Sequence, residues 1–108
     1  MTEQQKVIHN LRKGNYEYHE DASHAWLKVP KPALKALRIE NKISGFSYEY
    51  AGLVYLEEDL DAMTFLKALW PGLFMSETYK YWAEIHISEI NDGDESKIRS
   101  FPRYNPKT

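Results

Sequence analysis

Cysteine is absent from this chain of 108 residues. Without it, the protein has no disulfide, no thiolate ligand for a metal and no cysteine nucleophile. Residues 1–7 also lack the basic and apolar regions of a signal peptide. We therefore expect a cytoplasmic protein.

Glycine and long apolar runs are also scarce. Five glycines provide little material for a phosphate-binding loop, and the sequence has no G-x-S-x-G nucleophile motif. The longest apolar stretch, residues 65–75, is interrupted by Lys67 and Pro71, and it is shorter than the roughly 18 residues that span a bilayer. These absences argue against a nucleotide-dependent enzyme and a membrane protein, and we expect no cofactor.

Neither sign of charge dominates, because the formal net charge is only −2. A hydrophobic content of 43% and a charged content of 28% are typical of a globular domain. We predict one domain over residues 1–108, with loosely ordered ends at 1–13 and 105–108. The chain also carries three Trp, eight Tyr and four Phe. Because a core of this size cannot hold them all, we expect some to face a partner.

The clearest pattern in the chain is a hairpin followed by a helix. Aromatic and β-branched side chains recur at every second position over 46–50 and 53–57, on either side of a turn that contains Gly52. A helix is predicted at 61–69, ending before Pro71.

The start of that helix carries two expected stabilising contacts. Asp61 is predicted to be the N-cap, since its carboxylate would accept from free amides of the first turn. Leu60 and Phe65 have the spacing of a hydrophobic staple.

Shorter patterns predict the other elements, which are strands at 16–20, 24–29 and 79–89 and a helix at 32–38. Residues 1–13 show no cap and are interpreted as a frayed helix or a loose strand, and residues 97–104 as extended chain. The predicted fold is α+β: an antiparallel sheet of about four to five strands packed by two short helices. The predicted core comprises Leu27, Val29, Leu34, Leu37, Val54, Leu56, Phe65, Leu66, Leu69, Ile85 and Ile87.

Four acids gather before the second helix: Glu57, Glu58, Asp59 and Asp61, here called the acidic corner. Paired carboxylates serve metal-dependent or acid–base enzymes, but acids also complement the dipole at any helix start. The corner exceeds what one helix start requires. We therefore predict a surface that binds another protein, with Trp26 and Trp82 as aromatic anchors, and rank an enzyme third. Internal neutralisation is the open alternative, by Lys31, Lys35 and Arg38 or by Arg99 and Arg103.

A basic stripe on the first predicted helix is the best nucleic-acid signal. Lys31, Lys35 and Arg38 lie at spacings of four and three. A stripe of this kind would bind phosphates, and a small nucleic-acid-binding protein is the alternative function. A solvated helix face is the plainer interpretation, because no aromatic stacking platform is interleaved with the cations.

Histidines suggest a metal only superficially. His19 and His24 are five residues apart across a predicted turn, whereas the zincin motif places two histidines four apart on a helix. A hairpin would still bring them together, with His86 or Asp21 as a third ligand. Nothing in the spacing requires a metal, and we predict none.

Three further motifs stand out: HAWL at 24–27, YLEEDLDA at 55–62 and KIRSF at 97–101. Through these motifs, residues 16–104 resemble a family of small uncharacterised proteins of phages and plasmids. Family members carry Gly and Cys where this chain has Ala25 and Leu60, so no thiol-dependent role transfers. The resemblance implies a mobile element acting in the cytoplasm of a bacterial host, and because the family has no assigned activity it gives a setting and not a mechanism. From the acidic and aromatic surface in this setting, we predict a protein that modulates a host protein, such as one of host defence. Whether the protein forms a homodimer is left open by the sequence.

Overall fold

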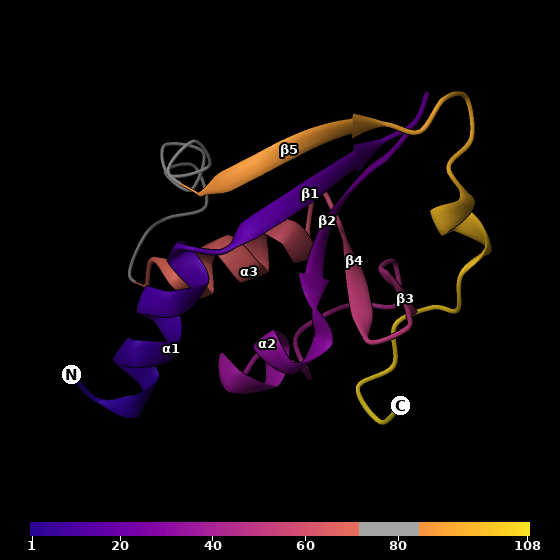
Figure 1. Cartoon of the computed structure of the whole chain (residues 1–108). Coiled ribbons are helices and arrows are strands. Elements are labelled where there is room, and N and C mark those ends of the chain that lie inside the picture. Colours follow the sequence, from indigo (N-terminus) through magenta and orange to yellow (C-terminus); the bar gives the residue numbers. More distant parts are fainter. Residues whose placement is uncertain (72–84) are drawn as a thin grey trace.

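The computed structural model describes residues 1–71 and 85–108, which form the α+β fold that the sequence predicts (Figure 1). A helix also forms at Glu3–Arg12, within the stretch for which the sequence left a frayed helix or a loose strand open. In chain order the elements are α1 (Glu3–Arg12), β1 (Asn15–Glu20), β2 (Ala25–Pro30), α2 (Lys31–Ala36), β3 (Tyr48–Tyr50), β4 (Leu53–Glu57), α3 (Asp61–Leu69), β5 (His86–Asn91) and a 3₁₀ helix (Lys97–Ser100).

The strands form one sheet in the order β3-β4-β2-β1-β5. Three neighbouring pairs are antiparallel, but β5 runs parallel to β1, with Tyr16 opposite Ile87. The sequence predicts antiparallel pairs only, because a hairpin leaves a local pattern whereas a pair of distant strands leaves none. The predicted strand 79–89 lies partly outside the described residues. Its described part is β5, which ends at Asn91, two residues beyond the predicted end.

The β3–β4 hairpin is confirmed. Its two-residue turn has positive φ at both positions, 54° at Ala51 and 80° at Gly52, as in the turn that matches the twist of two antiparallel strands. Pairing then places Tyr48 opposite Tyr55 and Tyr50 opposite Leu53.

The interpretation of the N-terminus as uncapped is wrong. Thr2 Oγ1 accepts from the amide of Gln5, and Gln5 Oε1 accepts from the amide of Thr2. This reciprocal pair is a capping box, which a threonine followed three residues later by glutamine predicts. The helix packs Val7, Ile8 and Leu11 against the core.

Helix boundaries differ from the prediction at three further places. Leu60, not Asp61, is the N-cap of α3, and it is 46% exposed although it was expected to pack as a staple. Helix α2 ends at Ala36, two residues early, because Arg38 has a φ of 61°. Residues 97–100 form a 3₁₀ helix where extended chain was predicted, and Ser96 Oγ accepts from the amide of Ile98 at its start.

The core lies between the sheet and the three helices, which all cover the same face (Figure 1). Every predicted core residue is buried except Ile87, which is half-buried and packs against the others. A smaller cluster of Trp26, Tyr55 and Ile98 occupies the opposite face, under the C-terminal segment. Both faces of β2 are therefore covered.

Candidate functional site

The acidic corner does not act as one charged unit. Asp61 is fully buried and accepts from the amide of Ser44 at 3.0 Å, from Ser44 Oγ at 2.6 Å and from Ser47 Oγ at 2.5 Å. Ser47 Oγ in turn accepts from the amide of Glu57. This carboxylate therefore ties the loop before β3 to the end of β4 and the start of α3.

Two more acids of the corner also have internal hydrogen bonds. Glu57 accepts from the amides of Asp59 and Leu60 at 3.0 and 2.9 Å, closing the turn before α3. Glu58 accepts from Tyr18 Oη at 2.9 Å. Within the described ranges, Asp59 alone of the four has a carboxylate without a hydrogen bond or ion pair. The partners are hydroxyls and amides, not the cations considered as internal neutralisers.

Glu57 and Asp59 line a hollow of about 440 Å³ on the surface. It lies on the face of the sheet away from the helices, where the C-terminal segment crosses. Two apolar side chains at its lining are strongly exposed, Phe46 at 66% and Leu60 at 46%. We call it the aromatic hollow; it is lined by His24, Trp26, Phe46, Tyr48, Glu57, Asp59, Leu60 and Arg103.

The hollow has an aromatic wall. The rings of Trp26 and Tyr48 meet edge to face at 6.2 Å, and the ring of His24 lies 6.0 Å from Trp26. The guanidinium of Arg103 lies over Tyr48, 4.6 Å from the ring centroid. Aromatic faces, two carboxylates and a cation thus meet in one small volume.

The predicted aromatic anchors are placed differently. Trp26 is 2% exposed and packs with Tyr55 and Ile98, so it contributes only a small edge to the hollow. Trp82 lies outside the described residues. The exposed apolar groups are instead Phe46 and Leu60, which sequence reasoning missed. The sequence predicts Phe46 within the strand 46–50, whereas the strand begins only at Tyr48, so Phe46 lies in the preceding loop; its neighbour Gly45 was the available signal.

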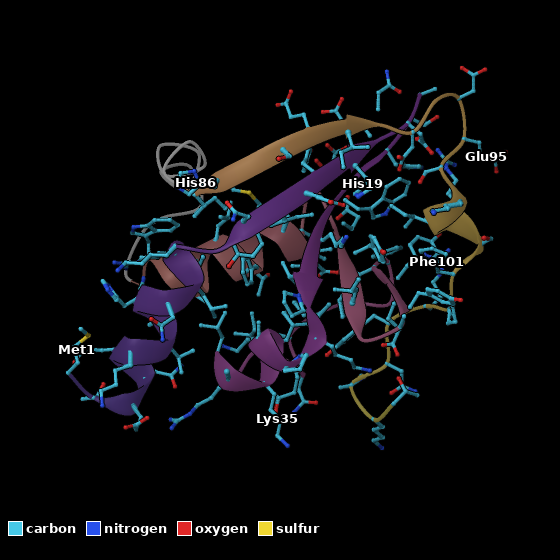
Figure 2. The ribbon with its side chains drawn as sticks, viewed as in Figure 1. Met1, His19, Lys35, His86, Glu95 and Phe101 are labelled. Atoms are coloured by element: carbon cyan, nitrogen blue, oxygen red, sulfur yellow. The ribbon has the colours of Figure 1, made fainter. Side chains whose placement is uncertain are left out.

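The basic stripe is divided in the structure. Lys31 Nζ contacts both carboxylate oxygens of Glu49 at 2.9 Å and donates to the carbonyl of Asn105. Burial opposes ionisation of Glu49, but the hydrogen bonds that it accepts, including that from Lys31, outweigh burial and lower its pKa. Lys35 points away from α2 into solvent (Figure 2). Arg38 lies past the end of the helix, so the three cations share no helical face.

His19 is enclosed by carboxylates beside the C-terminal segment (Figure 2). Its Nε2 lies 2.9 Å from Glu17 Oε1, and its Nδ1 lies 3.0 Å from Asp92 Oδ2. Hydrogen bonds from Lys28 and His19 lower the pKa of Glu17. Each ring nitrogen of His19 thus lies within hydrogen-bond distance of one carboxylate. No group of three metal-ligating side chains is found in residues 1–71 and 85–108.

Asp21 fastens the C-terminal segment to the β1–β2 turn. Its side chain is fully buried and accepts from Arg99 Nε at 2.6 Å and from the amide of Ser96 at 2.9 Å. The amides of Ser23 and His24 also donate to it. The Arg99 guanidinium, together with these amides, holds the pKa of Asp21 far below its usual range.

The fold and this site define the chain as a small α+β domain with an aromatic and acidic surface hollow. Comparisons with protein families, with curated proteins and with solved structures find no match for the chain. None of the helices in the described part is long and apolar enough to cross a membrane.

Proposed function

We propose that the protein is a non-enzymatic binding module and that the aromatic hollow is its contact surface for another protein. The observation that carries the proposal is the meeting of two exposed apolar side chains, Phe46 and Leu60, with the carboxylates of Glu57 and Asp59 in one hollow. Apolar anchors in a desolvated pocket supply most of the energy at protein interfaces. Acids around them mainly raise the association rate and select for a basic partner surface.

The setting that we propose comes from the resemblance to phage and plasmid proteins. A protein of a mobile element acts on the machinery of its host, and a host protein with a basic surface would complement Glu57 and Asp59. Proteins that handle nucleic acid, including those of host defence, carry such surfaces. We therefore propose that the chain acts in the bacterial cytoplasm by occupying such a surface.

The experiment compares proteins captured from a bacterial lysate by the wild-type chain and by the variant Phe46→Ser with Leu60→Ser. Both side chains are exposed, so the exchange should leave folding intact. A specific partner should be captured by the wild type and lost with the variant. Tyr50→Ser is the matched control, because Tyr50 is 59% exposed but does not line the hollow.

Asp59→Lys tests the electrostatic part of the proposal: it reverses one charge of the hollow and should reduce capture of a partner with a basic surface. It is preferred to a charge reversal at Glu57, because the Glu57 carboxylate closes the turn before α3.

Equal capture by the wild type and the Phe46/Leu60 variant would contradict the proposal. Recovery of nucleic acid alone, lost when Lys35 and Arg38 are changed to Ser, would support the nucleic-acid alternative instead.

A further inference from the structure

Four cations lie over aromatic rings in the part of the chain that the structure describes, and one of them is held differently from the rest. Arg12 over Trp70 donates to the carbonyl of Leu69 at 2.8 Å. Lys31 over Tyr104 is paired with a carboxylate, and so is Arg99 over Trp26. These three cations are fixed by strong polar partners.

Arg103 is the exception. Its guanidinium lies over Tyr48 at 4.6 Å and makes one long hydrogen bond, from Nη1 to the carbonyl of Gly45 at 3.3 Å. A guanidinium has five N–H donors, and the Arg103 side chain is exposed. Its backbone is held independently, by the bridge to Tyr48. The side chain can therefore leave the ring while the C-terminal segment stays in place.

The acids of the same hollow have no cation. Glu57 and Asp59 line it together with Arg103, yet neither forms an ion pair within 4.0 Å with any described residue. The Glu57 carboxylate is committed to two amides, whereas Asp59 retains its full capacity to accept. The hollow thus offers an aromatic face beside two carboxylates that have no ion-pair partner among the described residues.

We propose that the aromatic hollow binds the guanidinium of an arginine supplied by the partner protein, stacked on Tyr48 in place of Arg103 and facing Asp59 and Glu57. The proposal rests on the proposed function and names the chemistry that this surface recognises. A planar guanidinium stacks on an aromatic face and donates in the ring plane at the same time, which a compact ammonium does not do. Phe46 and Leu60 then contact the aliphatic stem and its neighbours.

In this arrangement Arg103 is an internal competitor. It occupies the ring face in the unbound protein and keeps the aromatic surface covered. A partner arginine gains the same stacking contact and adds the carboxylates that Arg103 leaves unused. Removing the Arg103 side chain should therefore strengthen binding, by about two- to fivefold if an exposed cation–π contact of ordinary strength is lost from the unbound state.

The test is an NMR titration of the whole chain with butylguanidinium, followed through the backbone amides of Phe46, Tyr48 and Leu60. Arg103→Ala should bind the probe about two- to fivefold more tightly than the wild type. Asp59→Asn should weaken binding, and Tyr48→Leu, checked for an unchanged melting curve, should abolish it. Arg38→Ala is the matched control and should match the wild type. Butylammonium should bind more weakly.

Weaker or unchanged binding in Arg103→Ala would overturn the proposal. So would preferential binding of butyrate that disappears with Arg103, since the hollow would then be an anion site. The two proposals fail separately. Capture of a protein that depends on Phe46, without binding of butylguanidinium, would leave the binding module standing and remove the arginine proposal. Binding of butylguanidinium without any Phe46-dependent capture would show a guanidinium site but remove the protein partner on which the arginine proposal rests.

Discussion

At the scale of single residues, Asp61 has a role quite different from the predicted helix cap. The sequence places an acid before an apolar helix, and capping is the local role for such an acid. The structure buries the carboxylate and surrounds it with the hydroxyls of Ser44 and Ser47. Ser44 and Ser47 lie 17 and 14 residues earlier, respectively, so no local pattern connects them to Asp61.

Replacing Asp61 with Ala should lower the free energy of unfolding by about 3 kcal/mol, because the buried hydroxyl of Ser47 and the partly buried hydroxyl and amide of Ser44 lose their acceptor. Urea denaturation would measure the change. Asp59→Asn is the control, with an expected effect within about 0.5 kcal/mol, since that carboxylate has no described partner. A loss below about 1 kcal/mol for Asp61→Ala would show that the network contributes little.

Asp21 makes stability depend on pH in the acid range. Its pKa is lowered in the folded state, so it binds a proton less readily there than in the unfolded chain, where it titrates near pH 4. The stabilisation is therefore complete above about pH 4 and is lost as the pH falls further. The melting temperature should decline over this range, and less steeply in Asp21→Asn than in the wild type.

The control for this prediction is the partner residue. Arg99→Gln should lower the melting temperature near neutral pH, since it leaves a buried carboxylate without its strongest donor. Once Asp21 is Asn, adding Arg99→Gln should have a much smaller effect. If the two changes lower the melting temperature additively, Asp21 and Arg99 do not stabilise the fold as a specific ion pair.

At the scale of elements, the sequence pattern predicted the hairpin and the helix whose contacts lie between residues close together in the chain. The β3–β4 hairpin follows from alternation on both sides of a Gly-containing turn, and the buried face of α3 follows from its apolar spacing. The end of α2 did not follow, because its C-terminal turn uses Arg38 where glycine is the usual residue. The parallel β1–β5 pair joins the second element of the chain to its last strand, and no local pattern encodes that contact.

Because Arg38 has a left-handed conformation, glycine should stabilise the protein at position 38 but destabilise it at position 35, inside the helix. Arg38→Gly should raise the free energy of unfolding by about 0.5–1 kcal/mol, because it relieves the steric cost of a positive φ in the turn after α2. Lys35→Gly is the matched control inside the helix. It should lower stability by about 0.5–1 kcal/mol. Chemical denaturation of both variants would check the pair, and a loss of stability in Arg38→Gly would contradict it.

At the scale of the whole molecule, the aromatic hollow is built from four separate stretches of chain. His24 comes from the β1–β2 turn, Phe46 from the loop before β3, Leu60 from the start of α3 and Arg103 from the C-terminal segment. The sequence predicted the two acids of this surface but not the apolar groups beside them. Their proximity depends on how the C-terminal segment crosses the sheet, which Figure 1 shows on the side away from the helices.

Ile98 fixes that crossing by packing on Trp26 and Tyr55. It is 1% exposed, so Ile98→Ala should lower the free energy of unfolding by about 2–4 kcal/mol through the cavity that it leaves. Calorimetry would measure the change. Lys97→Ala, one residue away and exposed, should stay within about 0.5 kcal/mol. If both variants melt like the wild type, the segment is not anchored through this cluster.

The same segment also determines where the sheet ends. Residues 102–104 run along the outer side of β3: the carbonyl of Pro102 accepts from the amide of Glu49, and the amide of Tyr104 donates to Ser47. An open strand edge is a template on which other chains polymerise. Here the outermost position is taken by residues 102–104, and so short an edge segment offers little free backbone to a newcomer. The segment therefore disfavours growth of the sheet on this side, and we expect a protease cut before Pro102 to expose the edge of β3 and promote aggregation.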